Sequence, residues 1–273
     1  MARLRRRNAP AGLSPVTGER ASVGDSASTP DREPFLDVLR GVAVLWMTAF
    51  HFAFDLSHFG FVHQDFYRDP VWTVQRTCIL SVFLFCAGFG QAMAVQAGQT
   101  WSRFWRRWTQ VAVCALAVSA GSALMFPNSW IYFGVLHGIA LMLIVCRATA
   151  AWGSWLWLTG LCAVLVGGFA PELHAALHLP TAMDAKFLNW LGLISHKPVT
   201  EDYVPVLPWL GVVWWGMAGG QLALSRGWLE KLALKGNAAP AAQFAWVGRW
   251  SLSWYMLHQP LLIGLLTVAN SLR

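Results

Sequence analysis

The sequence predicts an all-α membrane protein, a polytopic bundle of about seven transmembrane helices. Hydrophobic residues make up 56% of the 273 residues and charged residues only 12%, whereas a soluble domain carries about 25% charged residues. About seven apolar segments approach the length of roughly 20 residues that a membrane-spanning helix requires. The net charge of +7 is spread over linkers rather than gathered in a patch, so it indicates membrane topology and not nucleic-acid binding.

The apolar segments follow one another with short linkers between most of them. We place them at residues 36–57, 71–96, 104–126, 129–147, 153–170, 204–225 and 246–269. Basic residues fill alternate linkers and the N-terminal tail: Arg103, Arg106, Arg107, Arg147, Arg226, Lys231 and Lys235 lie on one side, and only Arg68, Lys186, Lys197 and Arg273 on the other. The positive-inside rule therefore places the N-terminus in the cytoplasm and the C-terminus outside.

Two regions outside the apolar segments have distinct compositions. Residues 1–32 are rich in Arg, Ser, Pro and Gly, which predicts a disordered basic cytoplasmic tail ahead of a single transmembrane domain at 33–273. The basic start at residues 3–7 is not followed by an apolar run within reach, so we expect no cleaved signal peptide. The outer loop 171–203 is long and partly amphipathic, and we expect it to form a short helix on the outer surface.

The first apolar segment carries the strongest functional signal. Asp37, Arg40, His51 and Asp55 all lie inside it. At about 100° per residue, Arg40 and His51 fall within about 20° of each other on a helix, and both acidic residues fall within about 60° of Arg40. Ionisable groups inside a span normally face a protein interior or a wet cavity, so this stripe predicts a functional site. The alternative is that the charges only neutralise each other as i,i+3 and i,i+4 pairs.

Later segments add three candidates. His137 lies between Gly134 and Gly138 in the fourth segment, where it lines the site or merely bonds a neighbouring helix. In the last segment, Tyr255 and His258 share one face of the helix, just before Pro260, which removes a backbone donor. We expect both to line a cavity rather than to be packed and satisfied in the core.

We expect no metal site and no disulfide framework. The five Cys fall in apolar runs without zinc-type spacing, which is typical of small core residues. Five further histidines are expected in loops outside the membrane, where solvated histidines are the ordinary case: His58, His63, His174, His178 and His196. His174 and His178 alone have the i,i+4 spacing of zinc ligands, and they would need further ligands from elsewhere.

Five blocks of the sequence, within residues 34–270, together resemble one known family. They read FLDVLRGVAVLWMTAFHFAFDL, SVFLFCAGFGQAMA, IYFGVLHGIALMLI, DYVPVLPWLGVVWWG and GRWSLSWYMLHQPLL. In order and spacing they resemble the bacterial members of the heparan-alpha-glucosaminide N-acetyltransferase catalytic-domain family. Arg40 and His51 also match the Arg-(ten residues)-His signature of the broader transmembrane acyltransferase superfamily.

The resemblance implies transfer of an acyl group, acetyl in the family, from cytoplasmic acetyl-CoA to a cell-envelope acceptor, which we expect to be a carbohydrate. A bacterial inner membrane is the location it implies. By this likeness Arg40 helps to hold the CoA end and His51 lies at the catalytic centre. The lysosomal relatives are assigned a catalytic His in the first outer loop, which only His58 or His63 could match here.

A mechanism drawn from the residues agrees with that implication. Arg40 lies about two turns into the segment, well placed for phosphate groups together with Asp37, and His51 lies about 16 Å deeper. Asp55, one turn further on, could orient the imidazole as a triad carboxylate does. His51 could then act as a general base or take the acyl group itself, with His137, Tyr255 and His258 completing the substrate cavity.

Two other classes of function fit parts of the pattern. A proton-coupled transporter or flippase could use His51 and Asp55 as a relay, although the internal repeats typical of transporters are not visible in the sequence. A non-catalytic scaffold could use the polar stripe only to pack helices. Binding of acetyl-CoA would separate the enzyme from both alternatives.

Overall fold

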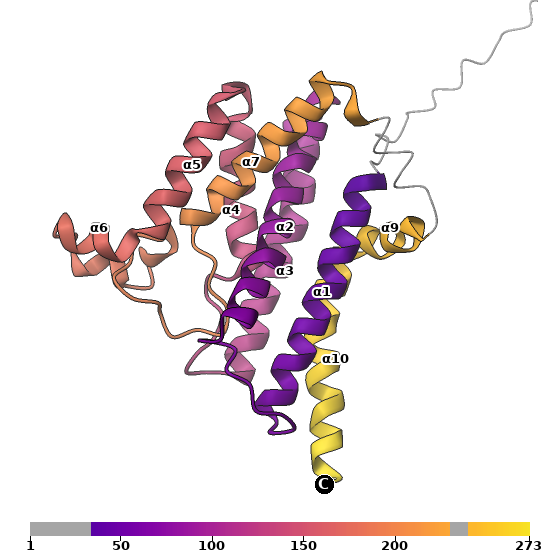
Figure 1. The fold of residues 1–273 in the computed structure, drawn as a ribbon, viewed down its shortest axis with the longest axis vertical. Helices are drawn as coiled ribbons and strands as arrows, with labels where there is room; N and C mark the ends of the chain where they lie inside the picture. Colours follow the sequence, from indigo (N-terminus) through magenta and orange to yellow (C-terminus); the bar gives the residue numbers. More distant parts are fainter. Residues whose placement is uncertain (1–33, 230–239) are drawn as a thin grey trace, which may run out of the picture. The chain divides into compact units, whose positions relative to one another are not determined.

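The computed structural model describes residues 34–229 and 240–273, and this part of the chain is all α-helical, as predicted. Its α-helices are α1 (Pro34–His58), α2 (Pro70–Gln96), α3 (Trp101–Met125), α4 (Val135–Ala148), α5 (Trp155–Gly168), α6 (Ala170–Ala176), α7 (Val206–Ser225), α9 (Ala241–Arg249) and α10 (Ser251–Ser271). Figure 1 shows their arrangement. The predicted tail at 1–32 lies outside the described residues, as do Lys231 and Lys235.

Each predicted segment contains a helix, but the count of seven spans is not confirmed. Four helices are long and apolar enough to cross a membrane, namely α1, α2, α3 and α10. The pair α5 and α6, bent by 72° at its break, would add a fifth span. With 14 residues, α4 is about 21 Å long and falls short of the roughly 30 Å hydrocarbon core. The apolar helices nevertheless make the chain a multi-pass membrane protein.

The last predicted segment, 246–269, is broken rather than continuous. The helix stops at Arg249, and α10 begins at Ser251 and continues through Pro260. The short α9 crosses α1 at close range (Figure 1), because a Cβ at Gly41 would overlap the backbone of Phe244 and a Cβ at Gly248 would overlap the carbonyl of Asp37. The break at residue 250 lets α9 turn aside onto α1 before α10 runs on along it.

The main core lies where α7 packs between α2 and α5. Leu84, Met142, Leu156 and Met217 are fully buried there. Glycines bring the backbones together, since a Cβ at Gly216 would overlap the backbone of α2.

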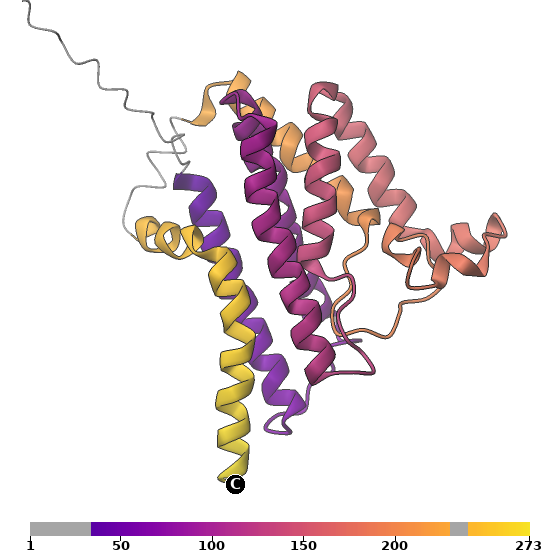
Figure 2. The ribbon, with the colours of Figure 1, turned by 180° about the vertical axis from the view of Figure 1, so that it is seen from behind.

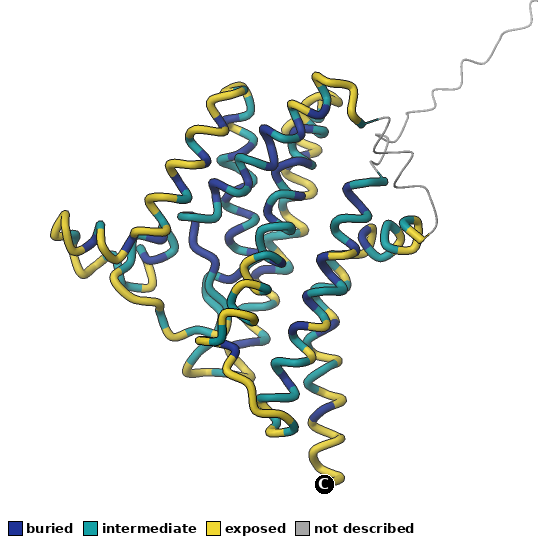
Figure 3. The backbone as a smooth tube through the Cα atoms, in the orientation of Figure 1, coloured by how far each residue is buried: buried dark blue, intermediate teal, exposed yellow. Residues whose placement is uncertain are grey.

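The end of α1 and the loop after it are fixed by an aromatic cluster. Phe66 is buried, and its ring centroid lies 4.2 Å from that of Trp72 at the start of α2. Phe50 meets both rings edge to face. Figures 1 and 2 agree that α1 and α10 lie side by side at one flank of the bundle. Figure 3 shows that the C-terminal half of α10 is largely exposed. The cluster therefore holds one edge of the α1–α10 pair.

The loop 171–203, which the sequence predicts to lie outside the membrane, contains a short helix, as expected. It is α6, seven residues long, and it is followed by the 3-10 turns η2 (Thr181–Asp184) and η3 (Asn189–Leu191). Asp184 ties the loop together by accepting hydrogen bonds from the backbone N–H and the hydroxyl of Ser195, at 2.8 and 2.9 Å. Burial alone would raise the pKa of Asp184, but these hydrogen bonds and the neighbouring His196 and His174 lower it overall.

His174 differs from its expected place in a solvated loop. It lies in α6 and is buried, with its Nε2 3.8 Å from Asp184 Oδ2. The loop returns to the bundle at Asp202, whose Oδ2 accepts the N–H of Val135 at 2.7 Å and so caps the start of α4. Burial raises the pKa of Asp202 above its ordinary value, while the Val135 N–H opposes that rise.

Candidate active site between the first and last helices

The candidate site lies along the contact between α1 and α10. The two helices run in the same direction, because successive contacts advance along both chains together. Three pairs of side chains meet in order from the start of α10: Trp254 with Thr48, His258 with His51, and Gln259 with Asp55.

Asp55 is held by Gln259 and not by His51. The Gln259 Nε2 donates to both carboxylate oxygens of Asp55, at 2.9 and 3.2 Å, and the carboxylate is only 3% exposed. An ionised carboxylate can only accept hydrogen bonds, so the amide must turn its NH₂ toward Asp55 and its Oε1 away. Within the described residues Asp55 makes no hydrogen bond to the His51 ring, so the expected direct orientation of His51 by Asp55 is replaced by the Gln259 contact.

His258 is oriented by its own helix. Its Nδ1 lies 2.8 Å from the carbonyl oxygen of Tyr255 and 3.2 Å from that of Trp254. Carbonyl oxygens only accept, so Nδ1 carries the proton, and in the neutral ring Nε2 is left with a free lone pair. That Nε2 is buried and has no hydrogen-bond partner among the described residues.

His51 faces His258. The two ring centroids are 5.1 Å apart and the planes are almost perpendicular, at 88°. His51 is half-buried, and the ring centroid of the preceding Phe50 lies 5.9 Å from that of His51. Two imidazoles from the two ends of the sequence therefore share one small region beside Gln259.

Asp37 and Arg40 form a second group near the start of α1. Arg40 Nη1 lies 3.3 Å from Asp37 Oδ1, and Asp37 is buried while Arg40 is half-buried. A Cβ at Gly90 of α2 would come within 2.9 Å of Arg40 Nη2, so the glycine leaves room for the guanidinium. The eleven residues between Arg40 and His51 correspond to about 16 Å along the helix. The four polar residues of α1 therefore form two groups at different positions along the helix. Both groups lie where α1 packs against α2, α9 and α10.

Comparison with known families bears directly on this site. The model of the family described as heparan-alpha-glucosaminide N-acetyltransferase, catalytic, matches residues 32–260. The chain belongs to this family. The match covers all of α1 and reaches α10 as far as Pro260, so it includes every residue of both polar groups. No curated protein and no solved structure matched the chain.

Not every predicted site residue joins these groups in the acetyltransferase-family fold. His137 lies at the start of α4, where its Nδ1 accepts the N–H of Gly134 at 3.3 Å and its Nε2 lies 3.1 Å from the hydroxyl of Ser119. That hydroxyl donates to the carbonyl of Ile131 at 2.7 Å. Both ring nitrogens are thus used in fixing the α3–α4 turn, and this network explains His137 without a substrate.

Tyr255 lies between the histidine pair and the aromatic cluster at the end of α1. Its ring centroid lies 5.8 Å from that of His258, and its side chain packs against the aromatic cluster at the end of α1. It therefore forms the wall between the two histidines and that cluster.

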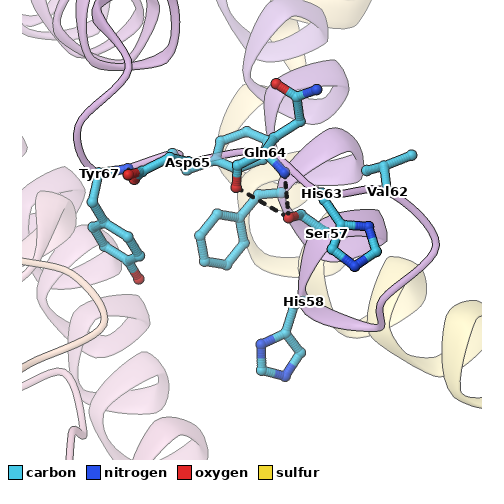
Figure 4. A pocket seen from close by; sticks show the side chains of 9 residues that line it. Ser57, His58, Val62, His63, Gln64, Asp65 and Tyr67 are labelled. Carbon is cyan, nitrogen blue, oxygen red and sulfur yellow. Dashed lines mark hydrogen bonds between the residues drawn. The ribbon is translucent and has the colours of Figure 1, made fainter.

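A shallow pocket of about 540 Å³ opens beyond the Asp55 end of α1 (Figure 4). Figure 4 shows His58 from the end of α1 together with His63 and Tyr67 from the loop that follows. The hydroxyl of Ser57 fixes this loop by bonding the backbone of Gln64. The two histidines considered as alternatives to His51 thus line one hollow, which neither Arg40 nor His51 lines.

Sequence reasoning did not single out Gln259 and Trp254. Gln259 is the partner of Asp55, and Trp254 Nε1 donates to Thr48 Oγ1 at 2.8 Å. A signal for Gln259 was present, because an amide side chain beside Pro260 in an apolar segment needs a partner for the same reason as a charge does. For residues 34–229 and 240–273, no group of three or more His, Cys, Asp or Glu side chains could hold a metal ion.

Proposed function

We propose that this protein is a membrane-embedded acyltransferase that moves an acyl group, acetyl by family likeness, from cytoplasmic acyl-CoA to a cell-envelope acceptor, with a carbohydrate as the expected acceptor class. The observation that carries the proposal is the polar cluster of His51, His258, Gln259 and Asp55 between two apolar helices, in a chain of the acetyltransferase family. Polar groups at such a depth are rare unless they serve a function.

Arg40 is the proposed contact for the phosphates of the donor. A guanidinium offers several donors in a planar fork that suits phosphate oxygens. It is half-buried near the start of α1, where the positive-inside rule places the cytoplasm. Asp37 orients the guanidinium through the 3.3 Å contact, and the acyl-pantetheine arm would cover the roughly 16 Å toward His51.

The proposed chemistry takes place at His51. A hydroxyl or amine of the acceptor attacks the thioester carbonyl carbon, the C–S bond breaks, and the proton of the attacking group passes to an imidazole and then to the leaving thiolate. Alternatively His51 accepts the acyl group first and the acceptor then removes it. Asp55 supports this centre through Gln259, and Tyr255 and His258 bound the substrate region.

The acceptor is proposed to arrive from the opposite side of the membrane. The pocket beyond Asp55 lies at the end of α1 away from Arg40 and is lined by His58, His63 and Tyr67. Imidazole, amide and aromatic side chains are suited to binding a hydroxyl-rich molecule. This orientation places the N-terminus in the cytoplasm and the C-terminus outside a bacterial inner membrane.

The test uses the full-length protein in lipid vesicles with radiolabelled acetyl-CoA and an envelope extract as acceptor. We expect label to move into an envelope component with the wild type, a loss of at least about 100-fold with His51→Ala, and a raised KM for acetyl-CoA with Arg40→Gln. His178→Asn is the matched control, because His178 lies outside both polar groups and its φ of 50° is a conformation that Asn tolerates. Full transfer by His51→Ala would refute the role of His51. Absence of transfer and of thermal stabilisation by acetyl-CoA, together with solute flux driven by a pH gradient, would favour a transporter.

A further inference from the structure

The orientation of His258 has a chemical consequence that the sequence pattern did not contain. Two backbone carbonyls, those of Tyr255 and Trp254, lie within hydrogen-bond distance of Nδ1. With Nδ1 committed as a donor, the neutral ring has its lone pair on Nε2. His258 therefore presents a basic nitrogen at a known position.

That nitrogen lacks a partner. His258 is only 8% exposed, and its Nε2 is fully enclosed without any hydrogen bond to the described residues. Leaving a buried acceptor unpaired destabilises the fold, so native proteins rarely do so unless another molecule supplies the donor. The side-chain amide of the next residue, Gln259, interacts with the His51 ring, and its enclosed Oε1 makes no other hydrogen bond to the described residues. A buried acceptor without a donor, at His258 Nε2, indicates a place where a molecule with an O–H or N–H group binds.

The ring of His51, unlike that of His258, is oriented by no backbone carbonyl in the described part of the chain. Its neighbours from α10 are the side-chain amide of Gln259 and the ring of His258, whose centroid lies 5.1 Å away. A general base works best when one nitrogen is held by a fixed acceptor and the other faces the proton to be removed, as in a catalytic triad. Here the two carbonyls hold Nδ1 of His258 and leave Nε2 free.

We infer that His258, through Nε2, is the general base that deprotonates the acceptor hydroxyl or amine. The inference rests on the proposed acyl transfer and assigns the base within it. The acceptor X–H donates to Nε2, X attacks the thioester carbon, the C–S bond breaks, and the imidazolium returns the proton to the CoA thiolate. The products are the acylated acceptor and free CoA. In this scheme His51 does not carry the acyl group, and its role is to position the thioester.

The decisive variant is His258→Asn. An Asn side chain can keep a donor near the position of Nδ1, facing the same carbonyls, but it has no counterpart of Nε2. We expect the kcat for label transfer from acetyl-CoA to fall about 10²–10⁴-fold, with the KM for acetyl-CoA changed less than about threefold and the fold retained by circular dichroism. The control His178→Asn should keep wild-type kcat.

Two further readouts separate a base from a merely structural residue. The wild-type rate should fall at acidic pH as the base is protonated, and His258→Asn should lose this acidic limb. Added imidazole should restore part of the kcat of His258→Ala and should leave the raised KM of Arg40→Gln for acetyl-CoA unchanged. In ¹⁵N NMR of histidine-labelled protein in bilayers, His258 should show a protonated Nδ1 and a bare Nε2.

The outcomes distinguish this inference from the function on which it rests. A wild-type protein that transfers label while His258→Asn retains more than about a third of its kcat would overturn the inference and leave the acyltransferase intact. A bare Nδ1 on His258 would overturn it equally. A wild type without any transfer would overturn the proposed function and the inference together.

Discussion

Replacing Gln259 by Leu tests the structural basis of the site most directly. The substitution replaces the amide by an apolar side chain of similar length. It removes both hydrogen bonds, 2.9 and 3.2 Å long, that reach the Asp55 carboxylate. Because Asp55 is 3% exposed, water cannot replace the lost donor without opening the contact between α1 and α10. We therefore expect the free energy of unfolding to fall.

The size of the fall follows from what is left behind. A hydrogen bond to a charged group contributes about 1.5–3 kcal/mol, and an uncompensated buried charge costs about 3–5 kcal/mol. Neutral bonds between membrane helices average only about 0.6 kcal/mol. Both bonds come from one NH₂ group, and Asp55 can escape its charge by taking up a proton. We expect a loss of about 2–4 kcal/mol at neutral pH.

The assay is a double-mutant cycle. Unfolding in mixed micelles by added denaturing detergent, followed by tryptophan fluorescence, gives the free energies for the wild type, Gln259→Leu, Asp55→Asn and the double variant. Asn removes the charge that Leu leaves unpaired, so the loss in the double variant should be smaller than the sum of the two single losses by about 1.5–3 kcal/mol. A Gln259→Leu protein within about 0.5 kcal/mol of the wild type, or strictly additive losses, would refute the assigned partnership.

Three other predictions follow from contacts away from the reacting groups. Gly248→Ala should reduce the free energy of unfolding by about 1–3 kcal/mol, because the added methyl group overlaps the backbone of α1. Gly264→Ala, on an open face of α10, should leave the free energy of unfolding unchanged. The same detergent titration measures both variants. Asp202→Ala should destabilise the start of α4 by about 0.5–2 kcal/mol, whereas Asp202→Asn, which keeps an acceptor oxygen, should lose less in the same titration. The lowered pKa of Asp184 means that its contacts stabilise the loop 171–203 above the ordinary pKa near 3.9 and are lost as the pH falls through the lower folded value. The protection of amides 181–196 from hydrogen exchange, measured relative to the intrinsic exchange rate at each pH, should therefore fall in that acidic range, and Asp184→Asn should abolish this fall in protection.

Each of the three has a result that contradicts it. Equal stability of the two glycine variants would mean that α9 does not lie against α1 as described. An Asp202→Asn protein as weak as the alanine variant would mean that the carboxylate charge, and not the acceptor oxygen, holds the helix start. Acid-independent protection in the wild type would remove Asp184 from the stabilisation of the loop.

The sequence predicted the features that depend on local periodicity. The apolar segments located the helices, and the spacing of Arg40, His51 and Asp55 placed them on the packed side of one helix, where the structure has them. Local spacing also gave the contact between Asp37 and Arg40, since it needs only an i,i+3 relation.

What could not be predicted depends on partners far apart along the chain. Gln259 and Asp55 are separated by 204 positions, and no periodicity within one helix reveals such a pair. The break between α9 and α10 also depends on a distant partner. It lets α9 pack against α1, where Gly41 and Gly248 each lie against the backbone of the other helix. His137 looked like an isolated intramembrane imidazole, yet a hydroxyl from α3 and a backbone amide occupy both its nitrogens.

The pairing of α1 with α10 also sets the order in which the site can assemble. Asp55 lies in α1, and its partner Gln259 follows 204 positions later in α10. Until α10 has been synthesised and inserted, the carboxylate of Asp55 lacks its amide donor and the ring of His51 lacks the ring of His258. The intervening helices therefore come before the polar cluster, and a chain cut ahead of α10 would hold only the half of the cluster that α1 contributes.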